Sequence, residues 1–280
     1  RRREARHREP GGTRKPDRFC HSHLYATGMD LNSVDVVILT WNDEPSMLDT
    51  AIRSALGSVG VEVSVHVVDN GSEPAPLLAE DLQTDPRVRL IRSERNLGVA
   101  RGRNLGIASG HNPYVLLLDS DAELRPDCAR RLLDAVRTPV PGDVSFSAPV
   151  YAGQRPEESA GMAPTLRLKM ARALNLRGDY QPVAVDGEPT WEIDFAIGAC
   201  QLFERSAWES IGGIDETYFY GPEDVDFCLR LKKSGRRLVQ VAGAECVHPP
   251  RRRHKNLLTV RGAQHGVAVA RHLWRHRGGV

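Results

Sequence analysis

Cysteine is scarce and scattered in this chain. Among 280 residues there are five cysteines, and none of them forms a C-x-x-C pair: Cys20, Cys128, Cys200, Cys228 and Cys246. A disulfide framework or a zinc ribbon requires paired, regularly spaced cysteines. The sequence therefore excludes both and favours a reducing compartment.

Long apolar runs are missing as well. No stretch approaches the roughly 18 apolar residues that a membrane-spanning helix needs, and neither a leader peptide nor an internal repeat is visible. We expect a cytoplasmic globular protein. Its 280 residues are enough to bury a substantial core in one large domain or two small ones.

The net charge of +2 conceals an uneven distribution. Residues 1–20 contain eight Arg or Lys and three Asp or Glu, whereas residues 251–280 contain eight Arg or Lys and no acid, so residues 21–250 carry −11. The acidic body fits a carboxylate-rich site. The basic ends are either solvated segments or attract anions.

Both basic ends differ in pattern from the body. We predict a disordered tail at 1–32, which is rich in Arg, Gly and Pro, and a basic amphipathic helix at 251–280. Such a helix packs on its own domain or lies on an anionic membrane. Peripheral contact at the inner face of the membrane is therefore the alternative to a purely cytoplasmic location.

Apolar β-branched runs alternate with amphipathic stretches in the first half. The alternation predicts a parallel sheet with helices on both faces. The predicted strands are 34–40, 61–72, 88–93 and 113–119, and the predicted helices are one capped by Asn42 or Asp43 and one over 97–110.

The second half has a gap in its pattern. Residues 151–190 show weak periodicity and read as a long loop or insertion. After the gap we predict a strand near 192–204, helices near 205–211 and over 221–235, and a strand that ends before His248.

Polar residues follow three predicted strands at their carboxyl ends. Asn42, Asp69 and Asp119 occupy these positions, where open α/β sheets bind ligands. The strand that includes Tyr114 runs directly into Asp119 and Asp121, with one serine between them. Hard divalent cations prefer such oxygen ligands, although an ordinary acidic turn gives the same pattern.

Other residues could complete a site around that pair. Arg103 lies in a glycine-rich stretch and could pair with phosphate, but the stretch lacks the G-K-[ST] ending of a Walker loop. Glu223 and Asp224 open a predicted helix and suit either dipole capping or a general base. His248 is a natural extra ligand if a metal lies nearby.

Seven segments in this order resemble the family 2 inverting glycosyltransferases of the GT-A fold, over roughly residues 34–250. The branch most similar is the non-processive one that includes bacterial rhamnosyl- and galactosyltransferases. The segments are VVILTWNDE (36–44), VVDNGS (67–72), RNLGVARGRNLG (95–106), LLLDSDAEL (116–124), IGACQLFERSAWESIGGIDE (197–216), GPEDVDFCLRLKKSG (221–235) and VHPP (247–250).

The resemblance implies an α/β GT-A fold with a Rossmann-like, mostly parallel central sheet and a small acceptor-side sheet region. It implies a nucleotide-sugar-binding half at 33–125 and an acceptor-binding, catalytic-base half at 126–250. The donor, a nucleoside-diphosphate sugar, would be bound by Thr40, Asn42, Glu44, Asp69, Arg103, Asp119, Ser120 and Asp121.

The resemblance also implies Mn²⁺ or Mg²⁺ held by Asp121 with His248 and Asp119. Gly198, Ala199 and Trp191 would lie on the acceptor side. Asp224 would deprotonate the acceptor hydroxyl, with Glu223 as the second choice, in one in-line displacement that inverts the anomeric centre. The acceptor would be a glycan, a lipid-linked sugar or a small molecule.

Other functions fit the sequence less well. The Q-x-x-R-W motif of processive synthases is absent. A nucleotidylyltransferase would need a basic triphosphate loop after the first strand, where Asp43 and Glu44 stand instead. A non-catalytic nucleotide-sugar-binding protein would not need Asp224. A nucleic-acid binder would need a reading motif and interleaved aromatic residues, and the acidic body would repel phosphate.

Overall fold

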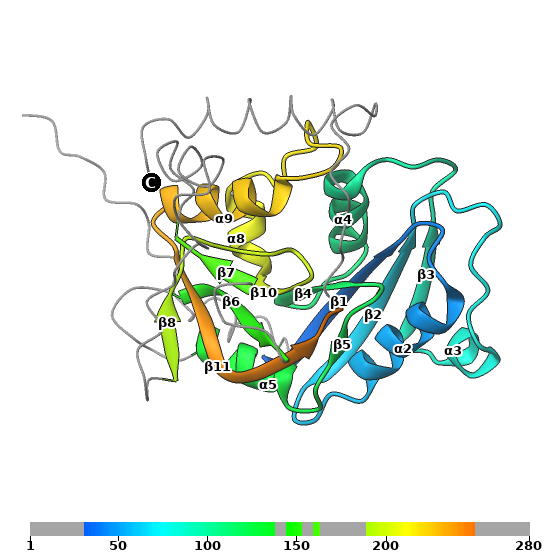
Figure 1. Cartoon of the computed structure of the whole chain (residues 1–280), viewed down its shortest axis with the longest axis horizontal. Helices are drawn as coiled ribbons and strands as arrows, with labels where there is room; N and C mark the ends of the chain where they lie inside the picture. Colours follow the sequence, from blue (N-terminus) through cyan, green and yellow to red (C-terminus); the bar gives the residue numbers. More distant parts are fainter. Residues whose placement is uncertain (1–30, 138–143, 153–158, 163–188, 250–280) are drawn as a thin grey trace, which may run out of the picture.

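The computed structural model describes residues 31–137, 144–152, 159–162 and 189–249 (Figure 1). Three predictions fall outside these residues. They are the tail at 1–32 apart from its last two residues, most of the stretch at 151–190, and the helix at 251–280.

A nine-stranded mixed sheet forms the centre of the described structure, with the order β3-β2-β1-β4-β10-β6-β11-β5, and β8 also pairs with β11. The first four strands are parallel, whereas β10 is antiparallel to both of its neighbours. The strands are β1 Ser33–Thr40, β2 Glu62–Asp69, β3 Val88–Arg92, β4 Tyr114–Asp119, β5 Glu123–Leu124, β6 Val144–Tyr151, β8 Thr190–Glu192, β10 Cys200–Glu204 and β11 Arg237–Val247. A second, two-stranded sheet pairs β7 Ala160–Gly161 with β9 Phe195–Ala196.

Helices cover both faces of the sheet, as the sequence predicts (Figure 1). One face packs against α2 Pro45–Leu56, α3 Glu80–Thr84 and α5 Cys128–Arg137, and the other against α4 Val99–Ala108, α8 Arg205–Ser210 and α9 Glu223–Lys233. Strand β1 contributes to both hydrophobic cores, because Val36 and Ile38 face the first core and Val37 faces the second. A strand buried on both faces explains its continuous apolar run.

Two glycines let α4 pack unusually close to the sheet. A Cβ at Gly102 would lie 2.5 Å from Leu39 of β1, and one at Gly106 would lie 2.4 Å from Val37. Only glycine leaves room for these contacts. Arg103, between the two glycines, is thereby carried into the interior, where it is 6% exposed.

Two local predictions need correction. The strand expected near 192–204 is divided among β8, β9 and β10. Glu44 rather than Asn42 or Asp43 occupies the N-cap position of helix α2, and its side chain makes no capping hydrogen bond. Asn42 instead has a φ of 53° and accepts a hydrogen bond from the Glu73 N–H, and the Asp43 carboxylate binds neighbouring side chains.

The sequence patterns do not predict four of the elements, namely the two-residue strands β5 and β7, helix α5 and strand β6. Helix α5 and strand β6 lie between residues 128 and 151, and they pack against each other. No helix among the described residues is long and apolar enough to cross a bilayer.

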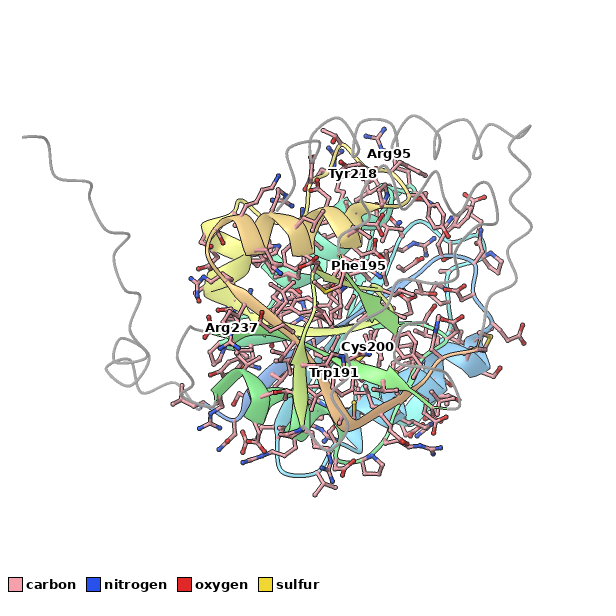
Figure 2. The ribbon with its side chains drawn as sticks, turned by 60° about the vertical axis from the view of Figure 1, so that its left-hand side comes forward. Arg95, Trp191, Phe195, Cys200, Tyr218 and Arg237 are labelled. Carbon is pink, nitrogen blue, oxygen red and sulfur yellow. The ribbon has the colours of Figure 1, made fainter. Side chains whose placement is uncertain are left out.

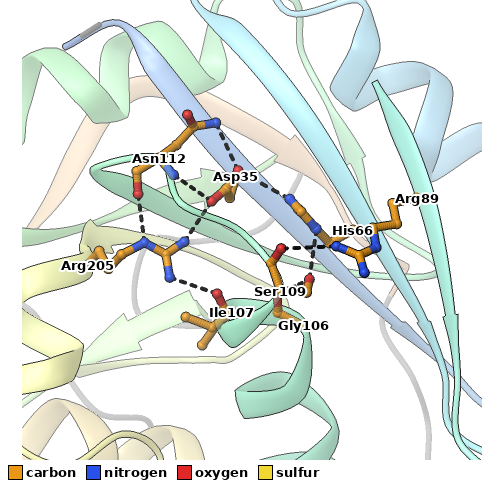
Figure 3. A network of polar contacts seen from close by, with 8 residues as sticks. All are labelled: Asp35, His66, Arg89, Gly106, Ile107, Ser109, Asn112 and Arg205. Carbon is orange, nitrogen blue, oxygen red and sulfur yellow. Dashed lines mark hydrogen bonds and ion pairs between the residues drawn. The ribbon is translucent and has the colours of Figure 1, made fainter. Parts of the chain in front are cut away.

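A buried polar network lies near the amino end of β1 (Figure 3). Asp35 accepts hydrogen bonds from the backbone N–H of Asn112 at 2.9 Å, from its side-chain amide at 2.8 Å and from Arg205 Nη2 at 2.6 Å. His66 Nε2 lies 3.2 Å from the same carboxylate, and its Nδ1 lies 2.8 Å from Ser109 Oγ. The network ties β1 and β2 to the end of α4 and the start of α8.

Candidate active site

Three possible metal ligands from distant parts of the chain meet at the carboxyl end of β4. His248 Nε2 lies 3.6 Å from Asp121 Oδ1 and 4.0 Å from Asp119 Oδ2. One ligand atom of each residue falls within 4.8 Å of the other two. The two carboxylates and the imidazole form a donor set that suits Mn²⁺ or Mg²⁺, with further positions left for water and phosphate.

Strand pairing explains how His248 reaches this place. Strand β5 follows the two aspartates directly and pairs antiparallel with the end of β11, with Val247 opposite Glu123. His248 is the next residue after β11. The Asp121 side chain is 2% exposed, that of His248 14% and that of Asp119 29%, so the cluster opens to solvent chiefly at Asp119.

Asp43 holds the turn between the two aspartates. Its Oδ2 accepts a hydrogen bond from Ser120 Oγ at 2.5 Å and another from Thr40 Oγ1 at 3.2 Å. Thr40 and Ser120, both predicted site residues, are thus joined through the carboxylate of Asp43, for which the sequence predicts only a helix cap or a charge that repels a triphosphate. Its place in the loop after β1 was the available signal.

The loops after β1 and β2 form one side of the site. Asp69 is fully buried, with Oδ1 accepting from the Ser72 N–H at 2.9 Å and Oδ2 lying 3.5 Å from Arg92 Nε. The Asn42 N–H donates to Ser72 Oγ at 2.9 Å. Asp69 therefore shapes the turn beside Asn42, while Glu44 is exposed at the start of α2.

Arg103 bridges the metal cluster and a second pair of carboxylates. Its Nη2 donates to Asp119 Oδ1 at 2.9 Å and to the Gly198 carbonyl at 2.8 Å, and its Nη1 lies 3.7 Å from Glu223 Oε1. Burial by itself would lower the pKa of Arg103, but the charges of Asp119, Glu223 and Asp224 raise it above the ordinary value. A permanent positive charge thus sits among three carboxylates.

Glu223 and Asp224 lie side by side at the start of α9. Burial, together with the charge of Asp224, raises the pKa of Glu223 to about 7, against the opposing effect of Arg103. Burial also raises the pKa of Asp224. A carboxylate with a raised pKa is better suited to accept a proton from a hydroxyl.

The two carboxylates differ in their partners. Asp224 is partly exposed, and its oxygens accept hydrogen bonds from the N–H groups of Gly198 at 3.0 Å and Val225 at 2.8 Å. Glu223 is 6% exposed, and its Oε2 has no hydrogen-bond partner among the described residues. Asp224 is thus the carboxylate that is oriented and accessible.

Gly198 connects the two halves of the site by its backbone. Its N–H binds Asp224 and its carbonyl binds Arg103. A Cβ at this position would lie 2.5 Å from Arg103 Nη1, so any larger residue would displace the guanidinium. The next residue, Ala199, accepts a hydrogen bond from the Asp119 N–H at 2.9 Å.

The structure does not bring Trp191 together with the other predicted residues. It is 9% exposed on β8, packs in the core shared with α4 and α9, and donates its indole N–H to Gln240 at 3.0 Å (Figure 2). An acceptor could touch only its small exposed part. Its place on the acceptor side stays a prediction.

Comparisons with known proteins bear on the family and the fold of the chain. The family described as Glycosyl transferase family 2 matches residues 35–212. An N-acetylglucosaminyl-diphospho-decaprenol L-rhamnosyltransferase of Mycobacterium tuberculosis (strain ATCC 25618 / H37Rv) is 30% identical over 231 residues, which cover 76% of this chain and 75% of that protein.

The chain belongs to glycosyl transferase family 2. Succinoglycan biosynthesis protein ExoO of Rhizobium meliloti (strain 1021) is 40% identical over 101 residues, 36% of this chain and 29% of that protein. The crystal structure of GalNAc-T7 with UDP, GalNAc and Mn²⁺ shares the fold, with a TM-score of 0.61 at 15% identity over 78% of this chain and 44% of that chain. The predicted GT-A architecture is therefore confirmed.

The family match ends at residue 212. Glu223, Asp224 and His248 lie beyond it, so their part in this glycosyltransferase is argued from the geometry of the site. The strongest geometric link is Arg103, which lies within the matched region and contacts both Asp119 and Glu223.

Proposed function

We propose that this chain transfers a sugar from a nucleoside-diphosphate sugar to an acceptor hydroxyl, with inversion and with help from a divalent metal. The observation that carries the proposal is the pairing of two carboxylate sites across Arg103. One is the Asp119–Asp121–His248 cluster, and the other is Glu223 with Asp224.

Asp121, His248 and Asp119 would hold Mn²⁺ or Mg²⁺, because their ligand atoms already converge. A divalent ion bound there would offset the charge that develops on the leaving nucleoside diphosphate. Asp69 and the Asn42 loop would hold the nucleotide. Asp43, by fixing Ser120, would keep the two metal carboxylates in place.

Asp224 would accept the proton of the acceptor hydroxyl. Its two hydrogen bonds from backbone N–H groups fix its orientation, and its raised pKa favours proton acceptance. The deprotonated oxygen would then form a bond to the anomeric carbon as the bond to the diphosphate breaks. Attack on the face opposite the leaving group inverts the configuration.

The acceptor is proposed to be a lipid-linked sugar, with a soluble glycan or small molecule as the alternatives. The relative matched along most of its length is named for an acceptor of the diphospho-decaprenol type. The charge of +8 on residues 251–280 would favour a cytoplasmic protein that touches an anionic membrane surface. Equal flotation with liposomes after removal of these residues would contradict that location.

A thermal-shift panel tests the proposal. UDP, dTDP, GDP and their sugars are each added with Mn²⁺, with Mg²⁺ or with chelator. We expect one nucleotide to raise the melting temperature by about 5 °C or more, in the presence of metal only. Asp121→Ala should abolish the rise, whereas Asp127→Ala, which removes an exposed ion pair with Arg131 of α5, should retain it.

The panel also discriminates among functions. A metal-dependent rise with a diphosphate would then be followed by nuclear magnetic resonance of the product, which reports the anomeric configuration. Retention of configuration would contradict the single displacement. No rise with any nucleotide in well-folded protein would contradict the transferase proposal and favour a different role for the carboxylate clusters.

A further inference from the structure

Tyr151 is a buried side chain that the proposed chemistry does not use. It is the last residue of β6, is 2% exposed, and lies opposite Cys246 of β11, two residues before His248. It contacts two separate parts of the site.

The first contact is between the rings of Tyr151 and His248. Their centroids are 5.3 Å apart, and the planes are inclined at 50°. Aromatic rings at this separation attract one another and restrict each other's rotation. The Tyr151 ring therefore limits the directions in which His248 Nε2 can point.

The second contact is between the Tyr151 hydroxyl and the backbone of residues 197–199, which we term the 197–199 turn. The hydroxyl donates to the Ile197 carbonyl at 3.3 Å. A tyrosine hydroxyl is protonated at neutral pH, so it can donate this hydrogen bond.

The 197–199 turn reaches both carboxylate sites through its backbone. The Gly198 N–H binds Asp224, the Gly198 carbonyl binds Arg103, and the Ala199 carbonyl accepts from the Asp119 N–H. Any shift of this turn would therefore move the orienting groups of both sites at once. Tyr151 is the side chain that links it to His248.

We propose that Tyr151 is a positioning residue that couples the His248 ligand of the metal site to the 197–199 turn of the base site. This inference rests on the proposed function for the role of His248. Its ring and its hydroxyl have separable tasks: the ring orients His248, and the hydroxyl fixes the turn.

Two variants separate these tasks. Tyr151→Phe keeps the ring and loses the hydroxyl, whereas Tyr151→Leu loses both. Tyr114→Phe, at a buried tyrosine at the opposite end of β4, controls for the loss of a buried hydroxyl. Phe146→Leu controls for the loss of a ring. Phe146 is a buried aromatic residue on β6, the strand of Tyr151, and it faces the core on the opposite side of the sheet.

The affinity for Mn²⁺ tests the role of the Tyr151 ring. Mn²⁺ binding is measured by electron paramagnetic resonance of the free ion, with UDP, dTDP and GDP each used as the nucleotide. We expect Tyr151→Leu to weaken Mn²⁺ binding about tenfold, as loss of a residue that orients a ligand does. Tyr151→Phe should restore the affinity to within about twofold of the unmodified protein, because the ring is retained.

Amide hydrogen exchange tests the role of the Tyr151 hydroxyl. Deuterium uptake is followed in a peptide that contains the 197–199 turn. We expect exchange there to be about fivefold faster in Tyr151→Phe, since the turn loses one hydrogen bond. Tyr114→Phe and Phe146→Leu should leave both the exchange of this peptide and the Mn²⁺ affinity unchanged.

Several outcomes would overturn the proposal. Equal loss of Mn²⁺ affinity in Tyr151→Phe and Tyr151→Leu would remove the role of the ring, and unchanged exchange in Tyr151→Phe would remove that of the hydroxyl. If Tyr151→Leu does not fold, the exchange measurement on Tyr151→Phe still decides the second part. Failure of the unmodified protein to bind Mn²⁺ with any nucleotide would contradict the proposed function, and with it the ring's role, whereas the exchange result stands by itself.

Discussion

The two ends of the parallel strands both bury charged residues, but they compensate the charges differently. At the amino end of β1, the Asp35 carboxylate has contacts with Asn112, His66 and Arg205 at 2.6 to 3.2 Å. At the carboxyl end, three carboxylates share Arg103, and the buried Glu223 Oε2 has no hydrogen-bond partner among the described residues.

The pKa shifts of the two regions run in opposite directions. Burial alone would raise the pKa of Asp35, but the hydrogen bonds from His66 and Asn112 and the charge of Arg205 lower it. At Glu223 burial prevails, and the pKa rises to about 7. The difference indicates that the network around Asp35 stabilises the fold. The carboxylates around Arg103 lower the stability of the fold instead, as is typical of a ligand-binding site.

Replacement of the proposed base should give the largest effect. Asp224→Asn keeps the shape of the side chain but cannot accept a proton, so we expect the release of nucleoside diphosphate during transfer to slow about a thousandfold. The free energy of unfolding should fall by only about 1 kcal/mol, because Asn has one acceptor oxygen and leaves one of the two backbone N–H groups without a partner. Asp226→Asn, on the same helix, is the matched control, since Asp226 is fully buried against Arg230 and should affect stability instead.

The outcome that would contradict this assignment is also clear. If Asp224→Asn retains activity and Glu223→Gln loses it, Glu223 is the base. The contrast between the Asp35 network and the carboxylates around Arg103 would still hold if Glu223 were the base.

Disruption of the amino-end network should mainly affect stability. Asp35→Asn leaves the half-buried Arg205 without its ionised partner, so the free energy of unfolding should fall by about 3 kcal/mol at pH 7. Urea unfolding measures the change. Asp81→Asn removes an exposed ion pair with Arg53 and should leave the urea midpoint nearly unchanged. Equal effects of the two variants would contradict a stabilising role for the network.

Removal of the Glu223 charge should stabilise the protein in a pH-dependent manner. Its folded pKa of about 7 lies above the ordinary value of 4.5, so the folded state holds a proton that the unfolded state releases between these values. The free energy of unfolding therefore falls as the pH rises from 4.5 to 7. Glu223→Gln lacks this loss and should be up to about 3 kcal/mol more stable at pH 8, but not at pH 4.

Urea unfolding of Glu223→Gln at pH 8 and at pH 4 tests the direction of this pH dependence. Glu80→Gln, at an exposed position on α3, should show no such gain. Asp35 has the opposite dependence, because its lowered pKa gives stability above pH 3.8 that is lost as the pH falls below that value. A gain for Glu223→Gln that is independent of pH would contradict the raised pKa.

Loosening the turn between the metal carboxylates should give the smallest effect. Ser120→Ala removes the hydrogen bond to Asp43 while leaving every metal ligand in place. We expect kcat/KM to fall about fivefold, the equivalent of one hydrogen bond of about 1 kcal/mol. Ser46→Ala, at an exposed residue of α2, is the control. A loss greater than a hundredfold would indicate that Ser120 contacts the substrate directly.

Local sequence patterns were sufficient for much of the fold. The apolar β-branched runs of β1 and β4 and the capping signals around α9 depend on neighbouring residues, so their elements were predicted correctly. The break between β9 and β10 was missed, because the Gly198 N–H leaves the strand pairing for a carboxylate 26 residues away. The local periodicity of apolar residues contains no information about a bond between residues so far apart in the sequence.

The candidate site divides in the same way. The sequence by itself placed Asp119 and Asp121 at the end of a buried strand and Glu223 and Asp224 at the start of a helix, since both arrangements follow from local periodicity. Local patterns left open whether His248 joins the aspartates, as the family resemblance implies, and the tertiary structure brings them together through the pairing of β5 with β11. The physical reason is that strand register and close packing between distant segments depend on the whole core.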